Sequence, residues 1–447
     1  MILKKIGIKV KFASKNRVHG WGRRFTDDKP IFVEEISGLK QEFLTLNQIS
    51  IVGGATSYGD SILSNSRKYF STKLHNSIAI DVENAVAICG GGLTFRELLA
   101  ASLPFGLIPC VIPGTYSATV GGAVAVDAHG KSLLAPNCMS NSILQFKLVN
   151  VMGEQIVKPE DELFKLTCGG LGSTGFIDEI HFKLRKSTEY LCEERIRVDG
   201  FAKLIDLMFE NQTTKEFQVA LLRFGKARDI ESLLITSVSS NENRKEGRDF
   251  LTWTRYLSLF LFPLKYLPFT VLNRKIIDIA VNLQFASREF SPQIRPLVNC
   301  INPLERIKSW HFLHGREGLT QWQRTIPFQY TYELEMILQE ILSSRFAPTL
   351  ITLKTLHETS KGNLGFVQPG WNLAIDFNYE GEVFLDFLKK LDSQIQAMHG
   401  KPYLAKDDYL SSDECKRFFS KRYFDQEQNM NRYVRNASKQ LERLFML

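Results

Sequence analysis

The chain has 447 residues, of which 44% are hydrophobic and 23% charged, a composition typical of a globular protein large enough for two domains. Its formal net charge of +8 favours anionic partners, either a phosphorylated substrate or a membrane face, and the lack of Lys/Arg runs, zinc fingers and RNA-recognition motifs argues against nucleic acid. Seven scattered cysteines without a CxxC pair predict reduced thiols in a cytoplasmic protein and no structural metal site.

The first 190 residues or so predict an α+β unit that is dense in glycine turns. A Thr-x-x-Glu capping box at 94–97 predicts the start of a helix, which should end at Pro104 and Gly106. The other expected elements are a strand running into a loop at 49–60, hairpins at 77–93 and 143–157, a short helix with proline in its first turn at 159–167, and a glycine-rich turn feeding a strand at 169–184.

After about residue 190 glycines become fewer and aromatic residues more frequent, which indicates a second domain. Strand-like runs at 217–224, 328–335 and 371–377 alternate there with longer helical patterns. The segment 384–400 predicts an amphipathic helix that is closed by Gly400.

Residues 250–272 form the most apolar segment of the chain. Two charged residues and the mid-segment prolines Pro263 and Pro268 make it a poor membrane-spanning helix. The favoured interpretation is a pair of core helices in the second domain. The alternative is a flap that contacts a lipid-carrying substrate or the inner face of the membrane, in which case the cytoplasmic protein would be peripheral.

Two glycine loops carry the clearest chemical signal: the first glycine loop at 53–60 (GGATSYGD) and the second at 113–123 (PGTYSATVGGA). Exposed backbone N–H groups in such turns form concave anion sites, and each loop adds hydroxyl groups. Neither loop fits a phosphate-binding Walker motif or a Rossmann fingerprint, and either alone reads as a tight turn. Together they predict a pyrophosphate-containing cofactor that is held from two sides.

Seven motifs follow one another along nearly the whole chain: GWGR (20–23), SYGD (57–60), LPFGLIPCVIPGT (103–115), TVGGAVAVDAHGKS (119–132), GGLGSTGFI (169–177), PGWNLAIDF (369–377) and PYLAKD (402–407). Their order resembles the PCMH-type FAD-binding domain of the vanillyl-alcohol-oxidase superfamily, and within it the branch of the decaprenylphosphoryl-β-D-ribose oxidases. The resemblance is specific for the fold and the flavin, and less specific for the sugar.

This resemblance implies an α+β fold in three parts. A two-part FAD-binding domain would occupy residues 1–190. A substrate-binding domain at 191–395 would hold an antiparallel sheet flanked by helices, and a C-terminal segment at 396–447 would return to the FAD domain. The residues that the resemblance places at FAD are Ile51, Val52, Gly53, Gly54, Ala55, Thr56, Ser57, Tyr58, Gly59, Asp60, Ser61, Pro113, Gly114, Thr115, Thr119, Val120, Gly121, Gly122, Val126, Asp127, His129, Ile177 and Tyr403.

Many superfamily members bond FAD to a histidine of the first loop. Residues 55–57 of this chain contain no histidine, so FAD is expected to be bound non-covalently. The glycine pair Gly121-Gly122 is expected to let the main chain lie against the cofactor, and nearby amide donors would favour the negative charge of reduced flavin.

The resemblance also implies catalytic and substrate-binding residues. Lys406, at the flavin beside the sugar, would act with Tyr403 to polarise or deprotonate the hydroxyl whose carbon loses hydride. A lysine whose pKa is lowered by burial and by nearby cations suits this role. His129, which follows the second glycine loop, is expected to be a further catalytic residue. The expected substrate contacts are Lys131 to a phosphate, Gln329 and Asn372 to sugar hydroxyls, and Lys406.

The implied function is oxidation of the 2′-hydroxyl of a polyprenyl-phosphate-linked pentose to a keto-sugar. A separate short-chain NAD(P)H-dependent reductase would consume this product, as in arabinose epimerisation for cell-wall polysaccharide biosynthesis. Two alternatives stay open: an aldonolactone or alditol oxidase that acts on a small soluble sugar and uses oxygen, and a flavin-binding module without turnover. The presence of His129, Tyr403 and Lys406 ranks both enzymes above the module.

A few remaining polar residues give weaker signals. His311 and His314 could share one helical face, but no carboxylate or thiol accompanies them as a metal set. Asp60 and Asp127 lie in or beside the glycine loops and are expected to cap backbone groups rather than to act as acids.

Overall fold

The computed structural model describes residues 14–16, 21–22, 31–35, 50–64, 68–134, 136–224, 229–242, 291–306, 310–315, 318–433 and 438–445. The apolar segment 250–272, with its two interpretations, lies outside these residues. Among the described residues, no helix is both long enough and apolar enough to cross a bilayer.

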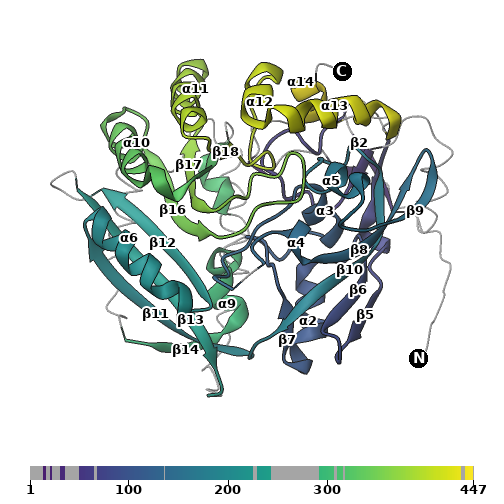
Figure 1. The fold of residues 1–447 in the computed structure, drawn as a ribbon, viewed down its shortest axis with the longest axis horizontal. Helices are drawn as coiled ribbons and strands as arrows, with labels where there is room; N and C mark the ends of the chain where they lie inside the picture. Colours follow the sequence, from purple (N-terminus) through teal and green to yellow (C-terminus); the bar gives the residue numbers. More distant parts are fainter. Residues whose placement is uncertain are drawn as a thin grey trace.

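The first half of the described chain builds two sheets, on the right in Figure 1. The strands of the first sheet are β1 (Ser14–Asn16), β2 (Ile31–Glu35), β3 (Ser50–Val52) and β4 (Lys68–Ser71), in the order β1-β2-β4-β3 with β2 and β3 parallel to β4. The second sheet is antiparallel in the order β5-β6-β10-β8-β9 with β7 also on β10, and its strands are β5 (Ile78–Asp81), β6 (Val86–Gly90), β7 (Leu107–Pro109), β8 (Ile143–Asn150), β9 (Gly153–Val157) and β10 (Phe176–Lys186). The pairs β5–β6 and β8–β9 are the two predicted hairpins.

The helical elements of this half are η1 (Thr72–Leu74), α2 (Phe95–Ser102), η2 (Leu103–Phe105), α3 (Val120–Ala125), α4 (Met139–Ser142) and α5 (Glu162–Thr167). The predicted capping box at the start of α2 is confirmed, because Thr94 and Glu97 each accept the other's backbone N–H. The position predicted for Pro159 is wrong. The Asp161 N–H donates to the Lys158 carbonyl, so Pro159 lies in a turn before α5 and not in its first turn.

The second half builds one large antiparallel sheet in the order β14-β11-β13-β12-β16-β17-β15-β18. Its strands are β11 (Tyr190–Asp199), β12 (Phe217–Phe224), β13 (Ile230–Ser240), β14 (Gln293–Pro296), β15 (Leu319–Ile326), β16 (Pro348–Leu356), β17 (Gly370–Asn378) and β18 (Lys401–Pro402). The helical elements are α6 (Phe201–Glu210), η3 (Asn211–Thr213), α9 (Leu297–Ile301), η5 (Pro303–Arg306), η6 (Trp310–His314), η7 (Phe328–Tyr330), α10 (Thr331–Ser343) and α11 (Glu382–Ala397).

Helices α6, α10 and α11 cover the outer face of this large sheet (Figure 1). One core joins them to it, in which Leu204 of α6, Ile337 of α10 and Leu388 of α11 are buried with Trp322 and Trp371. The predicted α+β fold, with an antiparallel sheet flanked by helices, is confirmed. The sheet's other face is left to line the site.

Two local predictions for this half are wrong. Residues 328–335, expected as a strand, form η7 and the start of α10. The buried positions of α10 (Leu334, Ile337, Leu338 and Ile341) have helical spacing, which outweighs the aromatic alternation of the shorter window. At the end of α11 the left-handed residue is His399 (φ 56°), not Gly400. Gly400 is still required, because a Cβ there would lie 2.4 Å from the Thr325 carbonyl oxygen.

The C-terminal helices are α12 (Ser412–Phe419), α13 (Lys421–Tyr433) and α14 (Lys439–Phe445), shown in yellow at the top of Figure 1. They contact residues of the first half. The Gln426 side chain of α13 donates to the Leu166 carbonyl and to Ser173 Oγ, and the Lys439 N–H donates to the Leu63 carbonyl. The end of the chain therefore packs against the sheets where it began.

Candidate active site

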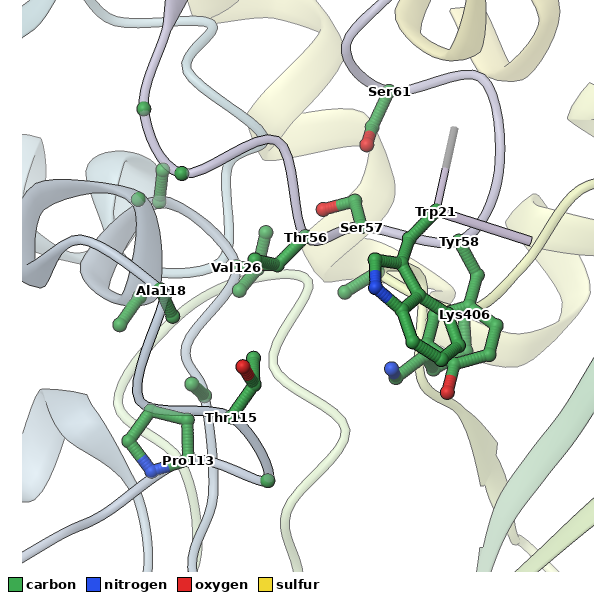
Figure 2. A pocket seen from close by; sticks show the side chains of 18 of the residues that line it. Trp21, Thr56, Ser57, Tyr58, Ser61, Pro113, Thr115, Ala118, Val126 and Lys406 are labelled. Atoms are coloured by element: carbon green, nitrogen blue, oxygen red, sulfur yellow. The ribbon is translucent and has the colours of Figure 1, made fainter. Parts of the chain in front are cut away.

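A cavity of about 680 Å³ lies between the first half of the described chain and the large sheet, a size typical of small-molecule sites. The two glycine loops, strands β15 to β17 and residues 403–406 all contribute to its lining. Figure 2 shows Thr56 and Ser57 of the first glycine loop across from Pro113 and Thr115 of the second, with Lys406 beside them. Segments from both halves of the molecule therefore meet at one site.

The two glycine loops touch each other directly. A Cβ added at Gly53 would lie 2.4 Å from Thr119 Oγ1, and one added at Gly54 would lie 2.2 Å from the Ser117 carbonyl oxygen. Glycine is thus required at both positions for the loops to approach. In the described part of the chain, no atom lies within 4 Å of a Cβ placed at Gly114, which borders the open cavity. This backbone cradle, with its hydroxyl groups, fits a pyrophosphate.

The glycine pair Gly121-Gly122 also has a role in packing. It lies in the first turn of α3, where Thr119 Oγ1 accepts the Gly122 N–H. The Gly121 N–H donates to the Gly91 carbonyl at 2.9 Å, and a Cβ at Gly121 would lie 2.8 Å from that oxygen. Packing of α3 against the glycines after β6 therefore requires Gly121, although both glycines also line the cavity.

Most residues expected at FAD line this cavity. They are Ile51, Gly53, Gly54, Ala55, Thr56, Ser57, Tyr58, Ser61, Pro113, Gly114, Thr115, Thr119, Gly121, Gly122, Val126, His129, Ile177 and Tyr403.

Five expected residues do not line the cavity, because each has a partner in the protein. Val52 packs on Tyr69, and Val120 is fully buried in the core. Gly59 lies against Asp407, and Asp60 forms an ion pair with Arg443 instead of capping a backbone group. Asp127 accepts the Ser140 N–H as expected of a capping residue, and it also accepts the hydroxyls of Ser140 and Ser360.

Lys406 is partly buried beside the first glycine loop. Its Nζ atom lies 3.3 Å from the centroid of the Tyr58 ring, and the Tyr58 N–H donates to the Ala405 carbonyl. Burial lowers the pKa of Lys406, Asp376 partly offsets this shift and Lys354 adds to it. Burial raises the pKa of Asp376 in turn. The lysine is thereby able to lose its proton near neutral pH, as proton transfer requires.

His129 lies in a buried amide network. Its Nε2 atom is 2.8 Å from Gln323 Nε2, a donor, and its Nδ1 atom is 3.2 Å from the Gly130 carbonyl oxygen, an acceptor. Asn372 Nδ2 also lies 3.3 Å from Nδ1, so both ring nitrogens are engaged within this network. Gln323 also donates to Asn372 Oδ1 at 2.9 Å. Burial, together with Lys354, lowers the pKa of His129, so the ring is neutral.

Tyr403 lines the cavity next to His129. Its ring stacks on Phe366 with centroids 4.3 Å apart and meets the His129 ring edge-on at 5.4 Å. Its N–H donates to the Gln323 carbonyl. Burial raises the pKa of Tyr403, with Asp127 adding to the shift, so its hydroxyl stays protonated and can donate a hydrogen bond.

The expected substrate contacts divide into two groups. Lys131 and Lys406 line the cavity, and the Lys131 Nζ donates to the Ile301 carbonyl. Burial, with Lys354, lowers the pKa of Lys131 to about 7. Gln329 is exposed in η7 and does not line the cavity. Asn372 is buried and does not line the cavity, but its side chain contacts two residues that do, Gln323 and His129.

The polar residues on the cavity face of the large sheet that sequence reasoning missed include Gln323 on β15, Lys354 on β16 and Asp376 on β17. Burial lowers the pKa of Lys354 to about 8, and Asp376 partly offsets this. The available signal was a charged residue at an alternating position within an otherwise apolar strand, which places it on one face. The pairing that brings the three together was not visible in the sequence.

His311 and His314 were the only histidine pair considered as metal ligands. Among the described residues, no group of three or more His, Cys, Asp or Glu side chains is arranged to bind a metal ion. His314 is buried, with Nδ1 2.8 Å from Asn378 Oδ1, a packing role as expected. The side chain of His311 lies outside the described part. All seven cysteines are free thiols, as predicted.

Comparison with known proteins agrees with this geometry. Residues 45–157 match the family model of an FAD binding domain. The chain is 24% identical over 419 residues to decaprenylphosphoryl-β-D-ribose oxidase of Mycolicibacterium smegmatis, which covers 89% of this chain and 90% of that protein. It is also 29% identical over 167 residues to a D-lactate dehydrogenase of Archaeoglobus fulgidus, 35% of this chain and 38% of that protein. These matches confirm the predicted FAD-binding domain, FAD as its cofactor and the resemblance stated from the motifs.

Proposed function

Because this chain is an FAD-dependent oxidoreductase with a PCMH-type FAD-binding domain, we propose that it oxidises a secondary hydroxyl of a sugar to a ketone, the 2′-hydroxyl of a polyprenyl-phosphate-linked pentose. FAD, when bound along the glycine loops, supplies the acceptor for the hydride that leaves the carbinol carbon. The observation that carries the proposal is the position of Lys406, partly buried against the Tyr58 ring of the first glycine loop, with its lowered pKa.

In this proposal the neutral Lys406 amine takes the proton of the hydroxyl. The carbon that bears this hydroxyl loses a hydride and becomes the carbon of the ketone. The ammonium ion that forms lies on the face of the Tyr58 ring and within the field of Asp376, and both stabilise it. The Tyr403 hydroxyl, protonated at neutral pH, is available to donate a hydrogen bond to the reacting oxygen or to a neighbouring hydroxyl.

His129 has a different role in this proposal from the catalytic role expected from the sequence. Its Nε2 atom is engaged by Gln323, and its Nδ1 atom lies beside the Gly130 carbonyl and Asn372 Nδ2. We therefore assign it to positioning: together with Asn372 it holds the Gln323 side chain at the cavity, where Gln323 orients the sugar.

The charge and polarity of the cavity support a substrate with an anionic and an apolar part. Lys131, Lys354 and Lys406 line it. Of the acidic residues in its lining, Glu305 is already engaged by Thr115, Tyr116 and Arg96. Val219 and Leu221 of β12, Ile235 of β13 and Leu350 of β16 form an apolar part of its wall. A phosphate beside the lysines and a lipid along this wall would satisfy both features.

The similarity to a protein named decaprenylphosphoryl-β-D-ribose oxidase, along most of both chains, supports the same substrate class. The keto-sugar would then pass to a separate NAD(P)H-dependent reductase. We propose a cytoplasmic location for the reaction, on an anionic lipid substrate at the inner face of the membrane.

The test is anaerobic mixing of the FAD-loaded protein with polyprenyl-phosphoryl ribose, with free alditols and aldonolactones in parallel. We expect the absorbance of oxidised flavin to be lost with the lipid-linked sugar only. Reduction by the free sugars alone, with hydrogen peroxide released in air, would instead indicate an alditol or aldonolactone oxidase. A flavin that none of these compounds reduces would indicate a binding module.

A further inference from the structure

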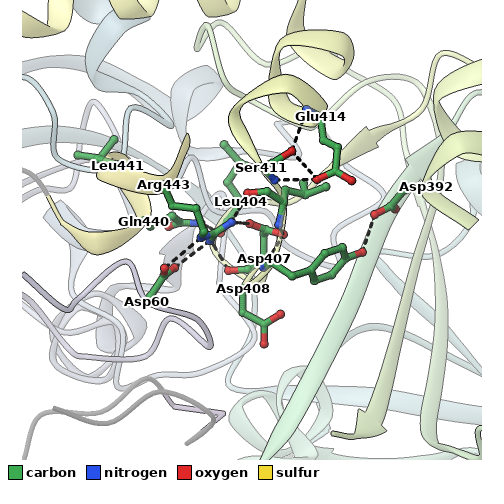
Figure 3. A network of polar contacts seen from close by, with 12 residues as sticks. Asp60, Asp392, Leu404, Asp407, Asp408, Ser411, Glu414, Gln440, Leu441 and Arg443 are labelled. Atoms are coloured by element: carbon green, nitrogen blue, oxygen red, sulfur yellow. Dashed lines mark hydrogen bonds and ion pairs between the residues drawn. The ribbon is translucent and has the colours of Figure 1, made fainter. Parts of the chain in front are cut away.

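Arg443 on α14 binds two buried carboxylates at once (Figure 3). Its Nε and Nη2 atoms donate to the two oxygens of Asp60 at 3.1 and 2.9 Å. Its Nη1 atom donates to Asp407 Oδ2 at 3.0 Å and to the Leu410 carbonyl. Asp60 and Asp407 are only 5% and 1% exposed, so the guanidinium satisfies charges that water does not reach.

The two carboxylates belong to the two segments that form the site. Asp60 ends the first glycine loop, directly after Tyr58 and Gly59. Asp407 follows Lys406 in the chain. The two segments are in direct contact here, since a Cβ at Gly59 would lie 2.2 Å from the Asp407 carbonyl oxygen. Any change in the spacing of Asp60 and Asp407 would therefore move Lys406 relative to Tyr58.

Further contacts from α14 fix the same two segments. The Gln440 side chain donates to the Leu404 carbonyl at 2.7 Å, and the Lys439 N–H donates to the Leu63 carbonyl at 2.7 Å. Leu441 lines the cavity itself. Thus α14 lies across the end of the first glycine loop and the loop of Lys406, and it contributes directly to the wall of the site.

The charges make Arg443 more than a packing residue. Without its guanidinium, Asp60 and Asp407 would be two buried carboxylates facing each other with their shared counter-charge removed. Such a pair must separate, bind protons or admit water, and each of these responses displaces the loops. Lysine in place of arginine would keep the charge but not the planar fork that reaches three carboxylate oxygens.

We propose that Arg443 is a positioning residue of the active site: it holds the first glycine loop next to the loop of Lys406. This one contact from the C-terminal helix α14 therefore stabilises both the loop that would bind FAD and the loop that carries the proton acceptor. The effect of Arg443 on FAD affinity requires only that the protein binds FAD. The effect of Arg443 on proton acceptance by Lys406 rests on the function proposed above.

The test measures two quantities in each variant: the Kd for FAD, and the limiting rate of flavin reduction by polyprenyl-phosphoryl ribose at saturating FAD, separated from the half-saturating substrate concentration. In Arg443→Ala we expect FAD binding to weaken by about tenfold or more and the limiting rate to fall by a similar factor, because breaking a buried pair costs several times the free energy of one tenfold step. Arg443→Lys should give intermediate values. Arg417→Ala, at an exposed arginine on α12, is the matched control and should leave both quantities unchanged.

Two single substitutions separate the two ion pairs of Arg443, one with Asp60 and one with Asp407. We call these two ion pairs the Arg443 bridge. Asp60→Asn should weaken FAD binding more than it slows reduction, and Asp407→Asn should slow reduction more than it weakens FAD binding. If the role of Arg443 were only structural, both variants would be less stable, and FAD affinity and reduction rate would change in the same proportion in each.

Wild-type FAD affinity and wild-type limiting rate in Arg443→Ala would overturn the proposal. If that variant does not fold, Arg443→Lys decides: full wild-type values there would show that charge alone suffices and that the bridge is not needed. If the wild-type flavin is not reduced by the sugar, the proposed function fails, while the FAD affinities of the same variants still test the bridge.

Discussion

The Nζ atom of Lys406 lies 3.3 Å from the centroid of the Tyr58 ring, so a residue near the end of the chain rests on a residue of the first glycine loop. The hydrogen bond from the Tyr58 N–H to the Ala405 carbonyl joins the same two segments. A loop that lines the FAD cavity therefore also holds the lysine that we propose as proton acceptor, and a disturbance of either segment should be felt by both.

Lys406→Met is expected to retain FAD and to lose flavin reduction by substrate. Methionine keeps much of the side-chain volume but cannot take a proton, and a positioned base contributes about 10² to 10⁴ in rate. The measurement is anaerobic stopped-flow reduction at saturating substrate, with FAD content determined on the same sample. Lys389→Ala, at an exposed lysine on α11, is the control. Flavin reduction at the full wild-type rate by Lys406→Met would exclude the assigned role.

Lys131 should make the stability of the apoprotein depend on pH. Its pKa is lowered to about 7 in the folded protein by burial and by Lys354, against an ordinary value of 10.5. Between these values the unfolded chain binds more protons, so the contribution of Lys131 to the free energy of unfolding rises with pH and is lost as pH falls through 7.

This dependence can be isolated by comparison with Lys131→Met. The free energy of unfolding of the wild type minus that of the variant should increase between pH 7 and pH 9, by at most about 1.4 kcal/mol per pH unit for one proton. The measurement is urea unfolding of both apoproteins at several pH values. A difference that stays constant or falls over this range would contradict the lowered pKa.

Gly54→Ala and Gly114→Ala should affect the protein differently. The new methyl group at Gly54 would meet the Ser117 carbonyl oxygen at 2.2 Å, so the loops must separate and the melting temperature of the apoprotein should fall. At Gly114 nothing in the described structure lies within 4 Å, so the melting temperature should stay the same while FAD binding weakens, because the methyl group enters the cavity.

The readouts are thermal unfolding without FAD and the Kd for FAD. Unchanged FAD affinity in Gly114→Ala would show that the cofactor does not approach the second glycine loop at this residue. An apoprotein of Gly54→Ala as stable as wild type would show that the loops do not pack as described.

FAD should be released from the denatured protein. Residues 55–57, in the loop where related enzymes attach FAD to histidine, are Ala, Thr and Ser. Acid precipitation should therefore leave the yellow colour in the supernatant. Yellow colour that stays in the washed pellet would demonstrate a covalent bond and contradict the prediction.

The cofactor side of the site could be predicted from the sequence because it is local. The glycines and hydroxyl residues that line the cavity follow one another in two short loops, and strict backbone requirements make them visible as patterns. A second requirement at Gly121 was not visible: the Gly91 carbonyl leaves no room for a Cβ there, and no single sequence window contains both segments.

The substrate side could not be predicted in the same way. Lys354 and Asp376 lie on neighbouring strands of the large sheet, and only strand pairing places them beside Lys406. Arg443 reaches Asp60 and Asp407 from the far end of the chain. At 328–335 the aromatic alternation suggested a strand, whereas burial of every third or fourth residue over a longer window selected a helix.

The proposed reaction is tested most directly by single-turnover flavin reduction with polyprenyl-phosphoryl ribose that carries deuterium at C2′. We predict that this substrate bleaches the oxidised flavin anaerobically, that deuterium at C2′ slows the bleaching, and that deuterium at C3′ does not. Bleaching that is unaffected by deuterium at C2′, or the absence of bleaching with the FAD-loaded wild type, would contradict it.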